Sequence, residues 1–113
     1  AFRRVPKVHR VYISSKNLTT IKKGAFRECT GMTKFNVVST KLNSLQKYAL
    51  YGNSKLKTII LKSEHLTKSN VGSKTFSGIK STATFTVPAG SVQNYKDLFK
   101  SKGAGSKFKV KSL

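Results

Sequence analysis

Acidic residues are almost absent from this chain of 113 residues, which has three of them against 23 lysines and arginines and a formal net charge of +20. General acid–base or nucleophilic catalysis requires several titratable groups that converge on one site. Besides Glu28, Glu64 and Asp97, the chain offers only two histidines and one cysteine. We therefore expect no enzymatic activity and no cofactor.

Motifs for metal or nucleotide binding are missing as well. No carboxylate has metal-ligand spacing to His9 or His65, and no GxGxxG or P-loop sequence occurs. Cys29 is the single cysteine and cannot form a disulfide within the chain, so cysteine content leaves the redox compartment open. We expect no metal site and interpret Cys29 as a buried structural thiol.

Long apolar runs and arginines are also scarce. No stretch approaches the roughly 18 consecutive apolar residues that a transmembrane helix requires, so the chain is not expected to insert into a membrane. Only Arg3, Arg4, Arg10 and Arg27 are arginines, and the other basic residues are lysines. Lysine is a hydrated point charge, whereas arginine is suited to bidentate recognition, so this balance favours diffuse electrostatic attraction.

Small and apolar residues, in contrast, recur at a spacing of 24 residues. The first row comprises Leu18, Ile21, Ala25, Phe26, Cys29, Met32, Phe35 and Val37. The second row, 24 residues further on, comprises Leu42, Leu45, Ala49, Leu50, Asn53, Leu56, Ile59 and Leu61. The third begins at Leu66 and, after two extra residues, continues as Val71, Thr75, Phe76, Ile79, Thr82, Phe85 and Val87. None of these positions is charged, and such a period predicts a solenoid with a buried lattice and a cationic shell.

Each row ends in alternating apolar residues, which is typical of a short strand. The expected strands cover residues 8–13, 32–37, 56–61 and 82–87. Stacked turns would place them about 4.8 Å apart in one parallel sheet. The segments 22–29, 46–53 and 72–79 are expected to form single helical turns or 3₁₀ pieces on the other side, where the small Ala25, Ala49 and Thr75 allow close approach. The predicted fold class is therefore an α/β repeat solenoid.

The repeat pattern stops after Pro88, and a different pattern follows. Ser91 is a candidate helix N-cap, and the next apolar residues fall on one face of a helix that reaches about residue 100. Residues 107–111 alternate basic and apolar, which predicts an edge strand whose lysines discourage further pairing. We therefore divide the chain into repeats over residues 1–88, comprising a partial turn 1–13 and turns 14–37, 38–61 and 62–88, and a cap over residues 89–113. Because Ala1 falls within a repeat, we expect a C-terminal part of a longer array.

These residues resemble the BspA-like leucine-rich repeats, a class found in surface proteins. The family pattern is a leucine, an isoleucine, Ala-Phe, a cysteine, a leucine and a strand, and the first row above follows it from Leu18 to Val37. The segment VPAGSVQNYKDLF, residues 87–99, is similar to the family's usual C-terminal sequence. Leu50, Asn53, Ile79 and Thr82 depart from the pattern. The resemblance implies a leucine-rich repeat module of a cell-surface or secreted protein, located at the cell surface or extracellularly.

The solvent face of the expected sheet is the candidate partner-binding surface. Stacking of the turns predicts one column of Arg10, Lys34, Thr58 and Thr84, and a second of Tyr12, Asn36, Ile60 and Thr86. An exposed tyrosine and isoleucine beside cations would suit a protein ligand, and the concave sheet is the usual binding surface of repeat proteins. The candidate binding residues are Arg10, Tyr12, Lys34, Lys57, Ile60 and Lys62.

Three functions remain open at this point. The first is an adhesion-like module that binds a protein or an acidic polymer on a host, matrix or cell surface. The second is binding of nucleic acid or another polyanion by the +20 surface, although most aromatic residues are assigned to the core and leave few stacking platforms. The third is a structural spacer. Lys22, Lys23 and Lys47 lie away from the sheet, so the basic charge is not confined to one face.

Overall fold

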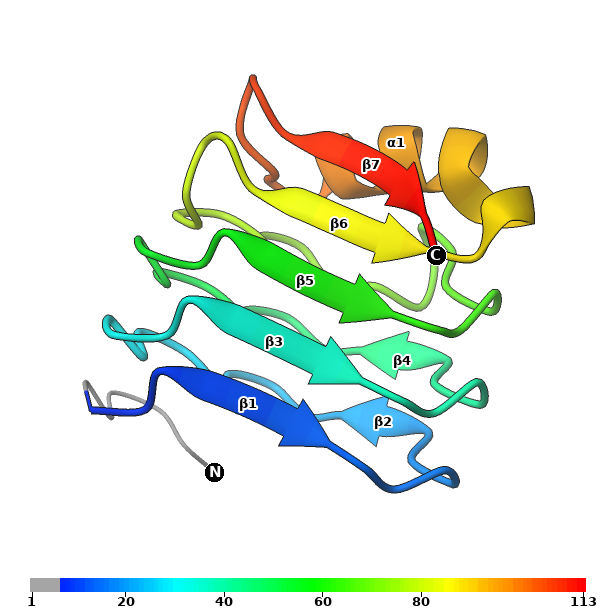
Figure 1. Ribbon diagram of the computed structural model, residues 1–113, viewed down its shortest axis with the longest axis horizontal. Helices are drawn as coiled ribbons and strands as arrows, with labels where there is room; N and C mark the ends of the chain where they lie inside the picture. The colour runs from blue at the N-terminus through cyan, green and yellow to red at the C-terminus, as the bar shows by residue number, and fades with distance from the viewer. Residues whose placement is uncertain (1–6) are drawn as a thin grey trace.

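The computed structural model describes residues 7–113, which wind into a solenoid of stacked turns (Figure 1). The strands are β1 (Arg10–Ile13), β2 (Thr20–Ile21), β3 (Lys34–Val37), β4 (Ser44–Leu45), β5 (Thr58–Leu61), β6 (Thr84–Val87) and β7 (Lys109–Ser112). The helices are the 3₁₀ helix η1 (Ala89–Ser91) and the α-helix α1 (Val92–Ser101). The predicted solenoid with short parallel strands, a C-terminal helix and an edge strand is confirmed.

One wall of the solenoid is a parallel sheet in the order β1-β3-β5-β6-β7. Phe35 lies opposite Val11 and Ile59, which reproduces the spacing of 24 residues seen in the sequence. Ile59 lies opposite Phe85, a spacing of 26, because the third repeat has two extra residues. The apolar residues of each strand therefore stack above one another on the inner face of the sheet.

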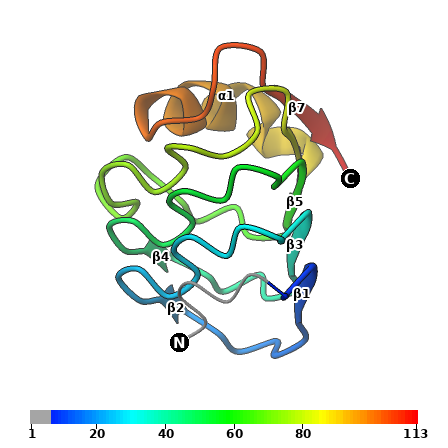
Figure 2. The same cartoon turned by 90° about the vertical axis from the view of Figure 1, so that its left-hand side faces the viewer.

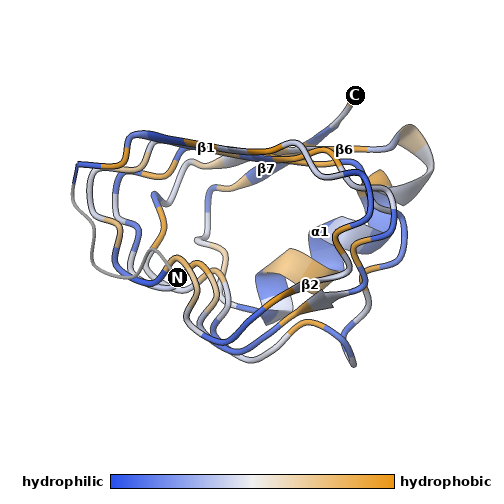
Figure 3. Ribbon diagram, turned by 90° about the horizontal axis from the view of Figure 1, so that it is seen from below, coloured by the Kyte–Doolittle hydropathy of each residue, from blue (hydrophilic) through white to orange (hydrophobic). Residues whose placement is uncertain are grey.

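The opposite wall is shorter and consists of β2 paired with β4, extended by a bridge from Leu45 to Val71. Figure 3 shows the two walls on opposite sides of the solenoid. The extra residues of the third repeat are accommodated in a loop that Asn70 closes. Its side chain accepts a hydrogen bond from the Thr67 N–H at 2.7 Å and donates one to the His65 carbonyl at 2.9 Å. This loop returns the chain to the register in which Val71 meets Leu45.

The segments between the walls are hydrogen-bonded turns and not the helical or 3₁₀ pieces that we expected over residues 22–29, 46–53 and 72–79. The Ala25 N–H donates to the Lys22 carbonyl within its own turn, whereas the next N–H, that of Phe26, donates to Ala49 of the following turn at 2.9 Å. An α-helix would direct each N–H to the carbonyl four residues earlier in the same segment. The sideways pairing between turns excludes that arrangement.

Backbone torsions at two repeated positions explain why these segments do not become helical. Residues with positive φ occupy the column Gly24, Tyr48 and Lys74, with φ of 62°, 63° and 56°. They also occupy the column Glu28, Gly52 and Gly78, with φ of 55°, 77° and 81°. A left-handed residue interrupts a right-handed helix and is costly for any residue with a side chain. The chain therefore turns at both positions in every repeat.

The core follows the rows found in the sequence, since all but three of the 24 row positions are buried. Leu18 and Ala25 are half-buried, and Thr82 is exposed. Ala83 is buried in place of Thr82, because its N–H closes a turn onto the Lys80 carbonyl and its own carbonyl accepts from Lys109. The expectation that Thr82 lines the core is therefore wrong by one residue.

A column of serines, which are not among the repeated apolar positions, links the sheet to the opposite wall. The Ser39 hydroxyl donates to the Leu18 carbonyl at 2.7 Å and accepts from the Lys41 N–H at 3.1 Å. Ser63, 24 residues further on, makes the corresponding bonds to Leu42 and His65. Both serines are buried, and these bonds satisfy the hydroxyl groups inside the fold.

At the end of the stack, α1 lies beside β7 and covers the last turn (Figure 2). The rings of Phe85 and Phe99 stack with centroids 4.2 Å apart, and Phe76 meets Phe85 edge-on at 5.1 Å. Ser91 occupies the N-cap position as expected, but its side chain makes no capping bond. The residue is buried, and its hydroxyl interacts with the Tyr95 phenol instead. The division into repeats 1–88 and a cap 89–113 stays a prediction.

Candidate partner-binding surface

The outer face of the sheet carries the predicted columns, extended by one strand. The register aligns Arg10, Lys34, Thr58, Thr84 and Lys109 in the first column. It aligns Tyr12, Asn36, Ile60, Thr86 and Lys111 in the second. Because the side chains of one column project from neighbouring strands, each column forms a continuous strip across the sheet. We call the outer side of these five strands the sheet face.

The six residues proposed from the sequence lie on the sheet face or at its border. Arg10 and Lys34 begin adjacent strands and are exposed. Tyr12 is 66% exposed, and Ile60 lies two strands away in the same column, at about twice the 4.8 Å spacing between strands. Lys57 and Lys62 are the exposed residues immediately before and after β5. The fold thus brings together residues that are up to 52 positions apart in the sequence.

Lys109 and Lys111 are sheet-face residues that sequence reasoning did not place there. The spacing from Thr84 to Lys109 is 25 residues, which matches neither of the periods found in the rows. The alternation of lysine with Phe108 and Val110 was the signal that could have placed them, since the apolar residues had to face the core. These two lysines give the face a basic border on its last strand.

The charges on the sheet face surround a neutral middle. Thr58, Ile60, Thr84 and Thr86 of the central strands are half-buried and uncharged. Basic residues stand on β1, β3 and β7 and at both ends of β5. Arg10 lies directly opposite Lys34, and like charges on neighbouring strands repel one another. A carboxylate of a partner would relieve this repulsion.

The turns formed by residues 22–29, 46–53 and 72–79, which we call the turn side, carry a second group of basic and aromatic residues. The Arg27 guanidinium lies 5.0 Å from the ring centroid of Tyr48 and 5.1 Å from that of Tyr51. The Lys47 ammonium lies 4.9 Å from the Tyr48 ring, and the Arg27 Nε lies 3.4 Å from a carboxylate oxygen of Glu28. Since protein cations already contact these rings, they make poor platforms for stacking nucleic-acid bases.

The remaining reactive side chains lie apart from one another. Cys29 is fully buried, and the Nδ1 of His9 lies 3.1 Å from the Gly31 carbonyl oxygen. Within residues 7–113, histidine, cysteine, aspartate and glutamate form no group of three that could hold a metal ion. In the same range, no helix has the length and apolar character needed to cross a membrane.

Comparison with known families accounts for this architecture. The family model described as BspA type Leucine rich repeat region (6 copies) matches residues 1–112. Neither the search of curated proteins nor that of solved structures found a match. Leucine-rich repeat domains generally mediate protein interactions and are typically non-enzymatic, and proteins of the BspA type are typically surface-associated. The chain therefore belongs to the BspA type of leucine-rich repeat proteins.

Proposed function

We propose that this chain is an interaction module of a cell-surface or secreted protein, and that it binds an acidic macromolecule through the sheet face in an adhesion-like role. The observation that carries the proposal is the neutral strip of threonine and isoleucine bordered by basic residues, with Tyr12, which is 66% exposed, two strands from Ile60 in the same column. The complementary partner surface has a neutral or apolar centre and carboxylates at its edge.

Tyr12 and the lysines contribute in different ways. A tyrosine offers a large contact area and only a small loss of side-chain entropy, so it is a common anchor residue in interfaces. Exposed lysines at a border mainly increase the association rate and fix the orientation of the partner. We therefore expect loss of Tyr12 to accelerate dissociation, and loss of Lys34 or Lys57 to slow association in a manner that depends on salt.

The size of the sheet face limits how tightly it binds by itself. Five strands spaced by about 4.8 Å, each contributing four residues at about 3.3 Å per residue, span roughly 250 Å². A stable interface buries about 800 Å² on each partner. The partner must therefore also cover the loops that carry Lys57 and Lys62, or else bind weakly and gain avidity from several copies.

The test compares two variants that each lose two positive charges, but from different sides of the molecule. Tyr12→Ala/Lys34→Ala/Lys57→Ala alters the sheet face. Lys22→Ala/Lys23→Ala removes two lysines from exposed positions on the turn side and serves as the control. Binding of poly-L-glutamate, heparin and a mixed-sequence DNA duplex is measured between about 50 mM and about 200 mM salt. We expect the triple variant to bind poly-L-glutamate about tenfold more weakly than the control variant, with unchanged thermal stability.

The other outcomes point to different functions. Equal losses in both variants would show diffuse attraction to polyanions and would contradict a dedicated face. Sequence-selective DNA binding that alone survives physiological salt would support a nucleic-acid function instead. Binding that vanishes for every probe at that salt concentration would favour the spacer role.

A further inference from the structure

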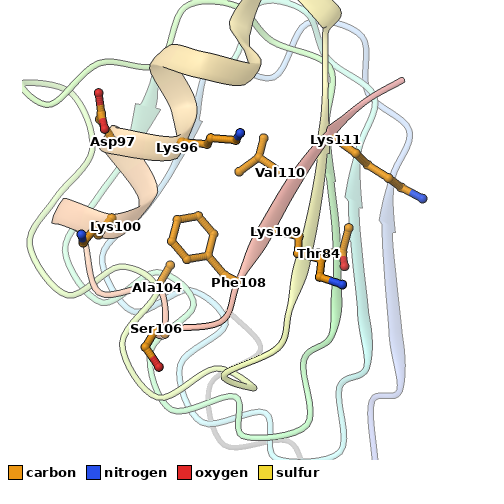
Figure 4. Close-up of a pocket in the computed structure, with 11 residues that line it drawn as sticks. Thr84, Lys96, Asp97, Lys100, Ala104, Ser106, Phe108, Lys109, Val110 and Lys111 are labelled. Carbon is orange, nitrogen blue, oxygen red and sulfur yellow. The ribbon is translucent and has the colours of Figure 1, made fainter.

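A groove of about 1030 Å³ runs along β7 at the far end of the sheet, and α1 forms its other wall. Figure 4 shows the side chains of Phe108 and Val110 pointing toward α1, and those of Lys109 and Lys111 pointing to the other side of the strand. The groove therefore touches both faces of β7. The groove shares Thr84, Lys109 and Lys111 with the sheet face, but none of the six candidate binding residues on or beside β1, β3 and β5 lines it.

Within residues 7–113, no strand pairs with the edge of β7 that borders this groove, and we call it the free edge of β7. β7 is the last strand in the sheet order, and the N–H groups of Lys109 and Leu113 donate to Ala83 and Val87 on the β6 side at 2.9 Å and 2.8 Å. Successive residues of a strand direct their N–H and C=O groups to opposite sides. The backbone groups of Val110 and Ser112 therefore point away from β6, where they form a template for another strand.

The side chains around this edge select the kind of strand that fits. Lys96 and Lys100 of α1 and Lys109 and Lys111 of β7 line the groove, with Asp97 as the single acid among the lining residues. The floor beside α1 is apolar: Phe108 is half-buried, with its ring 5.8 Å from that of Phe85, and Val110 is 9% exposed. A strand added to this edge would have Lys109 and Lys111 beside its outer face. Its inner face would meet the apolar Phe108 and Val110, with Lys96 and Lys100 of α1 nearby.

We propose that the free edge of β7 binds an extended peptide of alternating acidic and apolar residues as a sixth strand of the sheet. The acidic residues lie beside Lys109 and Lys111, and the apolar residues cover Phe108 and Val110. A second copy of this chain does not fit, because pairing two β7 strands would bring lysine against lysine. Lysines on the edge thus prevent self-association and favour an acidic segment.

Four synthetic peptides test the proposal without altering the protein. The first alternates glutamate and valine, and the second has the same composition in two blocks. The third and fourth repeat the first with N-methyl groups on alternate backbone amides, so that the two together cover every amide. N-methylation removes the donors that β-pairing requires and leaves the charge unchanged. We expect the alternating peptide to bind saturably, and the block peptide and one N-methylated version to bind at least about tenfold more weakly.

Protein variants locate the site. Lys109→Glu/Lys111→Glu should weaken binding of the alternating peptide at least about tenfold, whereas Lys22→Glu/Lys23→Glu, which makes the same charge change on the turn side, should have little effect. Equal binding of the parent and both N-methylated peptides would overturn the proposal, since it would exclude backbone pairing. Equal losses in the two protein variants, or no saturable binding by the unaltered chain, would overturn it too. If the triple variant of the sheet face bound poly-L-glutamate as tightly as its control, the proposed function would fail, but the peptide results expected for the edge of β7 would stay the same.

Discussion

Replacing Gly72 by alanine probes the close contact between two neighbouring turns. The Gly72 N–H donates to the Leu45 carbonyl at 2.7 Å, and an added Cβ would lie 2.6 Å from the Cα of Lys47. Real Cβ atoms do not approach backbone so closely, so one of the two turns must move. Gly24 is the matched control, because a Cβ there meets nothing nearer than 3.9 Å, although its φ is +62°.

The two substitutions should differ in cost for separate physical reasons. At Gly72, overpacking costs about 1–3 kcal/mol, and loss of the backbone hydrogen bond costs about 1 kcal/mol more. At Gly24, the left-handed conformation costs about 1–2 kcal/mol. At both positions the lower entropy of the unfolded chain offsets about 0.4–1 kcal/mol of the cost. We expect Gly72→Ala to destabilise the fold by about 2–3 kcal/mol and Gly24→Ala by about 1 kcal/mol.

Urea unfolding followed by circular dichroism measures both values. With equal m values, the midpoint of Gly72→Ala should fall at least twice as far below that of the unaltered chain as the midpoint of Gly24→Ala. A cost for Gly72→Ala that is no larger than that for Gly24→Ala would refute the close packing of turns described above.

Three further predictions concern the core and the charge. The Tyr95 hydroxyl donates to the Ser63 carbonyl at 2.6 Å and accepts from the Leu66 N–H at 3.2 Å, so Tyr95→Phe should cost about 1–2 kcal/mol at neutral pH in urea unfolding. Burial raises the pKa of Tyr95 above its usual 10.0, so the stabilisation is complete below pH 10.0 and is lost as pH rises through the higher folded-state pKa. The difference in free energy of unfolding between the unaltered chain and Tyr95→Phe should therefore narrow above pH 10.0. A difference that stays constant would contradict this reasoning. Asn53 donates to the Phe26 and Leu50 carbonyls at 2.9 Å and 2.7 Å, so Asn53→Ala should lower the free energy of unfolding by about 2–3 kcal/mol, whereas a loss below about 0.5 kcal/mol would show that these bonds matter little. Added salt should raise the melting temperature by screening a net charge of +20, and a melting temperature independent of salt would argue against strong self-repulsion.

Periodicity predicted the parts of the fold in which side-chain burial dominates. Phe35 and Ile59 lie opposite each other, as their spacing required. Only one register places the apolar residue of each turn on the inner face, because a shift by one residue would turn it toward solvent. The turn segments were predicted wrongly for a different reason. Gly24 was visible as a residue that tolerates positive φ, but Tyr48 and Lys74 adopt the same conformation without any such signal. The Tyr48 N–H donates to the Ser73 carbonyl of the next turn at 3.4 Å, and the Lys74 carbonyl accepts from the Ser77 N–H within its own turn at 3.2 Å.

The candidate surface was predictable to the extent that the repeat continued. The columns from Arg10 to Thr84 and from Tyr12 to Thr86 follow from the period alone. The period alone did not add Lys109 and Lys111 to them, because the chain passes through α1 before it returns to the sheet and the spacing changes to 25 residues. The free edge of β7 likewise depends on which backbone groups face β6, and this depends on the strand register.

The most direct test of the proposed sheet-face function is a nuclear magnetic resonance titration of the isotope-labelled chain with poly-L-glutamate at about 150 mM salt, where charges more than roughly 8 Å apart are screened. If the sheet face binds the probe, amide shifts concentrate in β1, β3, β5 and β6 and in the adjoining residues Lys57 and Lys62. Shifts spread evenly over all lysine-bearing surfaces, or centred on Lys22, Lys23 and Lys47 of the turn side, would contradict it.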